Sequence, residues 1–419
     1  MFRTIRENNL RYRFFLIFLI TLGSTCSSGV PYLVRTYYNI FQNSTGMTHE
    51  QLGFLLSMFG LGSMILYLPG GWMADRFSPR RLIAISYIGS ACLSAVMLTM
   101  PSFAVMCVLY LAYAIFNIFT LWAAETKIVR VMGTEEEQGK MQGFREALAG
   151  LGGVLVGFTV LFIGAQLPTE EATLYVLILF YMALGLICGV LLFLMLDDSS
   201  QNVASDQPKL KDIFIVAKNP KVWMVALIVF ACYTLFSAIS YLSPYLVDTY
   251  GISDDMGAAF GVIRQYGVRI FMCSLLGLLA DRIGSVNRVI RGSVFIILLH
   301  TLVYIFLPGS PSTKMVAIVL MLTMTCVANG LRGLYYAQMA ENRFPIKQTG
   351  SIIGFIAFVG YLPDVFFYTM VGGWIDKYGA LGYRYMFMYC AAVCVFCILI
   401  CTILYRMNKK DVRTAIATE

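Results

Sequence analysis

Long apolar runs, separated by short polar stretches, account for most of the 419 residues of the chain. A helix that crosses a bilayer needs about 20 mainly apolar residues, and these runs have that length. The short alternating pattern of a membrane β-barrel is missing. We therefore predict an all-α integral membrane protein with twelve spans, near residues 14–37, 51–72, 83–100, 103–126, 143–166, 172–196, 222–247, 257–280, 289–308, 315–338, 349–371 and 384–405.

One polar interruption is longer than the others and lies at the middle of the chain. It covers residues 197–221, with six predicted spans before it and six after it. Such a composition shift is typical of a boundary between domains. We predict an N-terminal six-helix bundle over residues 1–196, a cytoplasmic central loop over 197–221, and a C-terminal six-helix bundle over 222–419.

The composition excludes most classes of soluble protein. Apolar residues make up 59% of the chain and charged residues only 13%, against about 25% charged in a typical soluble domain. The eleven cysteines fall mostly inside apolar runs, which argues against a disulfide framework. Four of these cysteines form a helical stripe that could hold a metal, but packing is the stronger interpretation. We therefore expect no metal site and no cofactor. The composition also argues against a nucleic-acid partner. The stripe consists of Cys390, Cys394, Cys397 and Cys401.

The net charge of +8 is explained by topology. Of the 31 Lys and Arg residues, 24 lie in segments that share the side of the N-terminus or at the span ends that adjoin those segments. The positive-inside rule places such segments in the cytoplasm. We therefore predict that both termini are cytoplasmic. The opposite, outer segments carry only Arg35, Lys314, Lys377 and Arg384.

The two halves of the chain repeat each other. Residues 31–37 (PYLVRTY) and 244–250 (PYLVDTY) are identical at six of seven positions. Two further pairs correspond, namely 71–76 with 277–282 and 139–144 with 350–355. A six-helix unit duplicated in parallel orientation accounts for these matches.

A Gly-x-x-x-Asp-Arg stretch follows both the second and the eighth span. On these residues the chain resembles a major facilitator superfamily transporter, over all twelve spans. The stretches at 264–266 (RQY) and 360–364 (GYLPD) are also similar to the bacterial YihN-like branch of that family. The resemblance implies two pseudo-symmetric six-helix bundles, alternating access and a location in the inner membrane. We expect the carrier to act as a monomer.

The resemblance also implies a cytoplasmic latch. In the family, the carboxylate after span 2 meets the start of span 11, and the repeated copy would meet the start of span 5. A helix N-terminus carries a partial positive charge that attracts a carboxylate. The expected gating residues are Gly71, Asp75, Arg76, Arg80, Gly277, Asp281 and Arg282.

Charged residues inside predicted spans are costly and therefore point to function. Arg264 and Arg269 lie in span 8, Arg332 in span 10 and Asp364 in span 11, while Glu125 ends span 4. We expect Arg269 and Arg332 to bind an anion, and Asp364 and Glu125 to carry protons. The alternative for Arg264 and Asp364 is a purely structural ion pair. His300 is expected to be a core residue.

The family resemblance makes spans 1, 4, 7 and 10 the central helices that line the transport path. Hydroxyl and aromatic groups on them suit a small polar or sugar-like solute. Together with the two arginines, the expected substrate-binding residues are Asn329, Tyr336, Tyr32 and Tyr245.

We therefore predict a secondary active transporter, not an enzyme, for a small organic anion such as a carboxylate, sulfonate or sugar acid. Proton symport is the expected coupling. The alternatives are a multidrug or neutral-solute carrier and a non-transporting sensor with the same fold. An intramembrane enzyme would need a nucleophile–base or metal cluster, and the chain has only two histidines.

Overall fold

The computed structural model describes residues 10–122, 124–125, 127–128, 138–196, 216–342, 344 and 349–418. Over these residues the chain forms helices and no strand, which confirms the all-helical prediction. Within the same residues, ten helices are long and apolar enough to cross a membrane, and a bent pair makes an eleventh. These correspond to the second to twelfth predicted spans. The first predicted span, residues 14–37, overlaps α2 (Leu10–Gly29), a helix of 20 residues.

The chain divides into two compact units, which do not follow the two halves of the sequence. Unit 1 consists of the described residues within Met1–Ser205, Gly251–Ile270 and Asp364–Gly373, and unit 2 contains the other described residues. Besides α2, unit 1 contains α3 (Leu33–Thr36), α4 (Tyr38–Thr45), α5 (His49–Arg76), α6 (Pro79–Met97), α7 (Phe103–Ala114), η1 (Ile115–Trp122), α9 (Gln138–Gly164), α10 (Glu170–Met195), α14 (Asp254–Val262), η3 (Ile263–Gly267) and part of α20 (Pro363–Tyr378).

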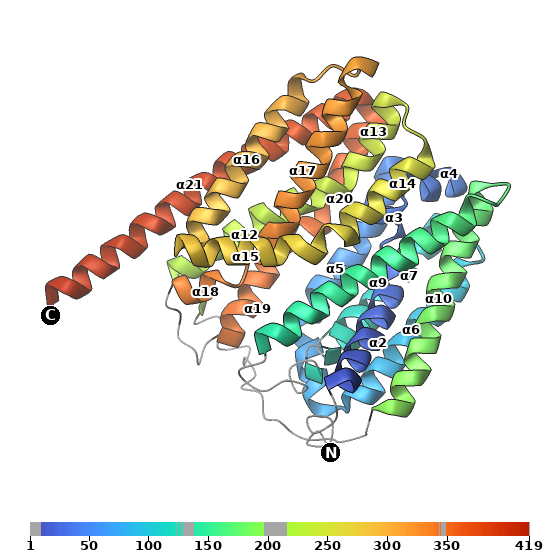
Figure 1. Ribbon diagram of the computed structural model, residues 1–419, viewed down its shortest axis with the longest axis horizontal. Helices are drawn as coiled ribbons and strands as arrows, with labels where there is room; N and C mark the ends of the chain where they lie inside the picture. Colours follow the sequence, from blue (N-terminus) through green and yellow to red (C-terminus); the bar gives the residue numbers. More distant parts are fainter. Residues whose placement is uncertain are drawn as a thin grey trace. The chain divides into compact units, whose positions relative to one another are not determined.

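Apolar contacts between long helices hold unit 1 together. Helix α10 packs against α2 and α6, and α2 also packs against α9 (Figure 1). Their shared core includes Leu16, Ile20 and Leu192, all almost completely buried. Tyr87 lies in this core and donates its hydroxyl hydrogen to the Ile20 carbonyl at 2.9 Å. This bond satisfies a polar group that would otherwise be costly to bury.

Segments from the second half of the sequence complete unit 1. Helix α14 packs against α3, α4 and α9. At Gly261 a Cβ atom would collide with the carbonyl oxygen of Thr36, so the absence of a side chain permits the close approach of α14 and α3. The start of α20 lies against α5 in the same way, since a Cβ on Gly60 would meet the backbone of Asp364.

Unit 2 is also a set of packed helices. Helix α21 packs against α16 and α12, and α12 packs against α19 (Figure 1). Its elements are α12 (Pro220–Ala238), η2 (Ile239–Tyr241), α13 (Leu242–Tyr250), most of α15 (Arg269–Ile283), α16 (Val286–Phe306), η4 (Pro311–Thr313), α17 (Lys314–Arg332), α18 (Gln338–Glu341), α19 (Thr349–Gly360), the end of α20 and α21 (Ala380–Thr418).

Several predicted spans are interrupted rather than continuous α-helices, and three of these interruptions lie near charged residues or π turns. The fourth changes from α7 to the π-helix η1, and the eighth passes through the π-helix η3 before α15. The eleventh is broken between α19 and α20, where Pro363 has no backbone N–H to continue the helical hydrogen bonds of α19. Single π turns inside helices often mark functional sites. The interruptions place Arg269 and Asp364 near helix starts.

Candidate functional site

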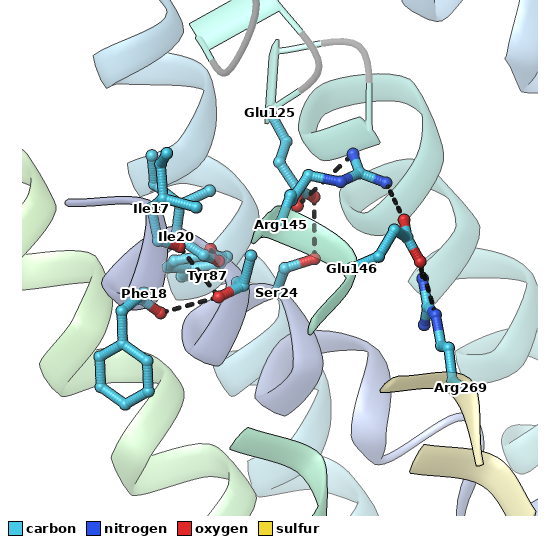
Figure 2. Close-up of polar contacts among 10 residues, drawn as sticks. Ile17, Phe18, Ile20, Ser24, Tyr87, Glu125, Arg145, Glu146 and Arg269 are labelled. Atoms are coloured by element: carbon cyan, nitrogen blue, oxygen red, sulfur yellow. Dashed lines mark hydrogen bonds and ion pairs between the residues drawn. The ribbon is translucent and has the colours of Figure 1, made fainter. Parts of the chain in front are cut away.

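Four charged side chains of unit 1 form a continuous series, which we call the Glu–Arg chain (Figure 2). Its members in order are Glu125, Arg145, Glu146 and Arg269. Arg145 lies 3.8 Å from Glu125 (Nη1 to Oε1) and donates to Glu146 Oε1 at 2.9 Å. The second oxygen of Glu146 accepts a hydrogen bond from Arg269 Nε at 2.6 Å and also contacts Arg269 Nη2. At the other end, Ser24 donates to Glu125 at 2.9 Å.

Four separate segments bring these side chains together. Arg145 and Glu146 lie on α9, Glu125 follows η1, and Ser24 lies on α2. Arg269 is the first residue of α15, directly after the turn that follows η3. Because α9 packs against both α2 and η3, it holds its two charged residues between these partners. The structure therefore brings together Arg269 and Glu125, which the sequence had proposed for different roles.

The Glu–Arg chain is balanced in charge and only partly buried. Its two carboxylates and two guanidinium groups sum to zero formal charge. In order along the series, the exposed fraction of the side chain is 9% at Glu125, 17% at Arg145, 31% at Glu146 and 20% at Arg269. Buried charges are tolerated when they are paired. The end formed by Glu146 and Arg269 is more exposed than the Glu125 end. The guanidinium group of Arg269 suits a carboxylate or sulfonate ligand.

A second ion pair of unit 1 is more deeply enclosed. Arg35 Nη2 donates to Asp364 Oδ1 at 2.9 Å, with only 4% and 11% of the two side chains exposed. The guanidinium carbon of Arg35 lies 4.5 Å from the ring centre of Tyr32 and 4.8 Å from that of Tyr368. Arg264, also buried, donates to the backbone carbonyl of Arg35. Asp364 thus pairs with Arg35, whereas Arg264 binds the backbone beside that pair.

Arg332 and the predicted binding residue Tyr336 lie in unit 2, beside a group of aromatic rings. The guanidinium carbon of Arg332 lies 4.5 Å from the ring centre of Phe236. The hydroxyl groups of Tyr336 and Tyr361 are 3.0 Å apart, and the rings of Tyr361 and Tyr233 pack with centroids 4.7 Å apart. This arrangement offers a cation, hydroxyl groups and apolar ring faces within one unit.

The other predicted binding residues have mainly structural contacts. Asn329 is buried and donates to the carbonyl of Thr325 at 3.0 Å, within its own helix. Tyr245 is 5% exposed and packs against the rings of Tyr304 and Phe387. Their roles in substrate binding stay predictions.

The predicted gating residues lie at or near helix ends. Arg76 is the last residue of α5, and Asp281 and Arg282 are exposed near the end of α15. Arg80 lies over the ring of Phe193, with its guanidinium carbon 4.3 Å from the ring centre. A Cβ on Gly277 would meet no atom within 4 Å. The structure does not describe the surroundings of Gly71 or the side chain of Asp75, so the latch stays a prediction.

Glu341 has a role that the sequence did not indicate. Its carboxylate accepts hydrogen bonds from Ser285 Oγ at 2.6 Å and from the Asn287 backbone N–H at 2.9 Å. Both donors lie at the start of α16, where an acceptor satisfies a free N–H and complements the helix dipole. Glu341 therefore stabilises the connection between α15 and α16.

Sequence reasoning missed Arg35, Arg145 and Glu146 as members of charged clusters. Arg145 and Glu146 fall inside the predicted span 143–166, and that position was the available signal. Arg35 was counted as an outer-segment cation, yet it is buried because the chain continues as the short helix α3. Arg145 and Glu146 are neighbours, but the other partners, Asp364 of Arg35 and Arg269 of Glu146, lie on distant segments and could not be identified from spacing.

His300 and the cysteine stripe take no part in these clusters. His300 is half-buried, and its ring nitrogens lie 2.7 Å from the carbonyl of Ile296 and 2.7 Å from the hydroxyl of Thr323. The stripe cysteines on α21 are buried and unbridged. Over the part of the chain that the structure describes, no group of three or more His, Cys, Asp or Glu residues could hold a metal ion.

The family model of the Major Facilitator Superfamily matches residues 14–368. The chain belongs to this superfamily. It is 30% identical to the inner membrane protein YqcE of Escherichia coli, over 91% of this chain and 92% of that protein. It is 23% identical to the inner membrane protein YihN of the same organism, over 89% and 90% of the two chains, which confirms the similarity to that branch.

Solved superfamily structures share the fold. A bacterial homologue of the human lysosomal transporter Spinster, in an inward-facing form, has a TM-score of 0.74 at 15% identity and covers 96% of this chain and 99% of its own. A shorter match joins 18% of this chain to 16% of a probable galactarate/D-glucarate transporter, GudP, of Bacillus subtilis, at 30% identity. The protein is thus a multi-pass membrane protein with a superfamily transporter fold.

Proposed function

We propose that the protein is a secondary active transporter that carries a small organic anion across the inner membrane by alternating access. The observation that carries this proposal is the Glu–Arg chain, in which Arg269 is paired yet partly exposed inside a membrane-crossing segment. Placing an arginine in that setting costs free energy, so its presence points to a function. Its guanidinium group matches a carboxylate, a sulfonate or the acid group of a sugar acid.

The partial match to GudP supports an anionic, hydroxylated substrate. Arg332 supports it independently in unit 2, where it lies beside the hydroxyl-bearing rings of Tyr336 and Tyr361. Arg269 and Arg332 are each proposed as anion-binding residues, and each can be tested by itself.

The proposed transporter moves protons with its substrate. Glu125 is the proposed proton carrier of the Glu–Arg chain, and Asp364 is the second candidate. Both are carboxylates within hydrogen-bonding or ion-pair distance of an arginine, so a gained proton would weaken that ion pair. In proteoliposomes with an imposed pH gradient, anion uptake should depend on the gradient in the parent and lose this dependence in Glu125→Gln or Asp364→Asn.

The proposed architecture keeps the two sequence halves, 1–196 and 222–419, as the moving bundles, joined by the cytoplasmic loop 197–221. The signature residues at the ends of α5 and α15 would control closure on the cytoplasmic side, and no second subunit is required. In this scheme Asp75→Asn and Asp281→Asn slow transport while the protein still folds. Unchanged transport kinetics in both variants would remove the gating role.

A thermal-shift screen of the purified protein tests the substrate class. D-glucarate and methanesulfonate should raise the melting temperature, because a ligand that binds the folded state stabilises it. D-glucitol, a neutral polyol with six carbons like D-glucarate, should not. Stabilisation by D-glucitol alone would favour a neutral-solute carrier, for which the tyrosine hydroxyls beside Arg332 are the supporting observation. Binding of an anion without uptake into proteoliposomes would indicate a sensor.

A further inference from the structure

Glu146 bridges two arginines, with a different carboxylate oxygen on each. Oε1 accepts from Arg145 at 2.9 Å, and Oε2 accepts from Arg269 Nε at 2.6 Å. Arg145 is the neighbouring residue on the same helix, whereas Arg269 comes from a segment more than a hundred residues away. The carboxylate thus has one local partner and one distant partner.

The contact with Arg269 is chemically the contact that an anionic substrate would make. A carboxylate binds an arginine through N–H donors such as Nε and Nη2, and Glu146 contacts both of these atoms. We infer that Glu146 is a resident carboxylate, which occupies the anion-binding face of Arg269 until a substrate anion displaces it. This inference rests on the proposed function.

The exchange is feasible because neither charge is left unpaired. When Glu146 releases Arg269, it still contacts Arg145, and the substrate carboxylate takes its place on Arg269. An unpaired buried charge would cost several kcal/mol, so a retained partner is what makes the displacement possible. Both exchanging groups are also accessible, with 31% of the Glu146 side chain and 20% of the Arg269 side chain exposed.

The Arg35–Asp364 pair shows the contrasting case. Its side chains are 4% and 11% exposed, and aromatic rings lie near the arginine at 4.5 Å and 4.8 Å. A ligand could reach this arginine only after the rings had moved. The accessible pair is therefore the one suited to exchange.

The sign of one affinity change tests the inference. Glu146→Gln removes the competing charge but keeps the shape of the side chain. If Glu146 competes with the substrate, this variant should bind D-glucarate about tenfold more tightly than the parent. If Glu146 only positions Arg269, the same variant should bind more weakly. Glu171→Gln, which alters an exposed carboxylate in the first turn of α10, is the matched control and should bind as the parent does.

The measurement is isothermal titration calorimetry of the purified, folded, full-length proteins with D-glucarate and with methanesulfonate. The gain in affinity of Glu146→Gln should disappear when Arg269→Ala is added, because the arginine that Glu146 no longer occupies is then missing. Equal or weaker binding by Glu146→Gln, in a series whose parent binds the anion, overturns the inference and leaves the proposed function intact. No binding of either anion by the parent or by Glu146→Gln overturns both the anionic substrate class and the inference.

Discussion

At the residue scale, the protein contains two arginine–carboxylate pairs with similar chemistry and different surroundings. Arg269 and Glu146 keep a substantial part of their surface exposed, whereas Arg35 and Asp364 are enclosed. Exposure decides which pair a solute can reach, and enclosure decides which pair stabilises the fold. Removing Arg269 should therefore have a different consequence from removing Arg35.

Arg269 should control affinity. Arg269→Lys keeps the charge but loses the planar donor group, and Arg269→Ala loses both, so substrate binding should weaken in that order. Truncating one partner of a desolvated charge pair costs about 2–5 kcal/mol of binding free energy. Titration calorimetry on folded protein measures the loss, and Arg384→Ala at an exposed position is the control. Parent-like affinity in Arg269→Ala would assign Arg269 to the scaffold.

The Arg35–Asp364 pair should control stability. Removing one partner leaves a buried charge uncompensated, at a cost of about 3–5 kcal/mol in the free energy of unfolding. Arg35→Met and Asp364→Leu should each lower the melting temperature of the purified protein. The double variant should lose less than the sum of the two, since it leaves no unpaired charge. Single variants as stable as the parent would contradict a stabilising role.

At the element scale, interruptions of the helices place the charged residues. Arg269 follows the π-helix η3, and Asp364 follows the break between α19 and α20. Close helix packing then fixes the partners, as where Gly261 of α14 approaches α3, the helix that carries Arg35. If the span of Arg269 or that of Asp364 were a continuous α-helix, these two side chains would point in other directions.

Gly261→Ala should test this packing. Its new methyl group would collide with the Thr36 carbonyl, so the helices must separate, at a cost of about 1–3 kcal/mol in the free energy of unfolding. Gly292→Ala is the matched control on α16, where a Cβ would meet no atom within 4 Å. This control should be neutral or stabilising by about 0.5–1 kcal/mol, since alanine favours helices. Equal melting temperatures for both variants would rule out a tight α14–α3 contact.

At the scale of the whole molecule, the distribution of Lys and Arg determines the expected orientation. With 24 of the 31 in segments on one side or at the span ends that adjoin them, reporter fusions at the N-terminus, within residues 197–221 and at the C-terminus should all indicate the cytoplasm. Reporters that respond only to the cytoplasm or only to the periplasm make the measurement. A periplasmic signal from the central segment would reject the predicted topology.

The sequence by itself determined the class of fold and the family. Hydrophobic runs long enough to cross a bilayer specify helices locally, and the duplicated Gly-x-x-x-Asp-Arg stretch is a local pattern as well. The sequence also identified Arg269, Arg332, Asp364 and Glu125 as unusual, because the cost of a charge inside an apolar span can be assessed from one segment.

Only the tertiary structure decided which charges meet. Arg35 and Asp364 are 329 residues apart, and Arg269 and Glu146 are 123 apart. The internal repeat could not supply these pairs, since the counterpart of Arg35 is Asp248, which accepts a hydrogen bond from Tyr383. Ion pairing depends on distance and burial between packed helices, and these are set by side-chain fit and helix interruptions rather than by spacing along the chain.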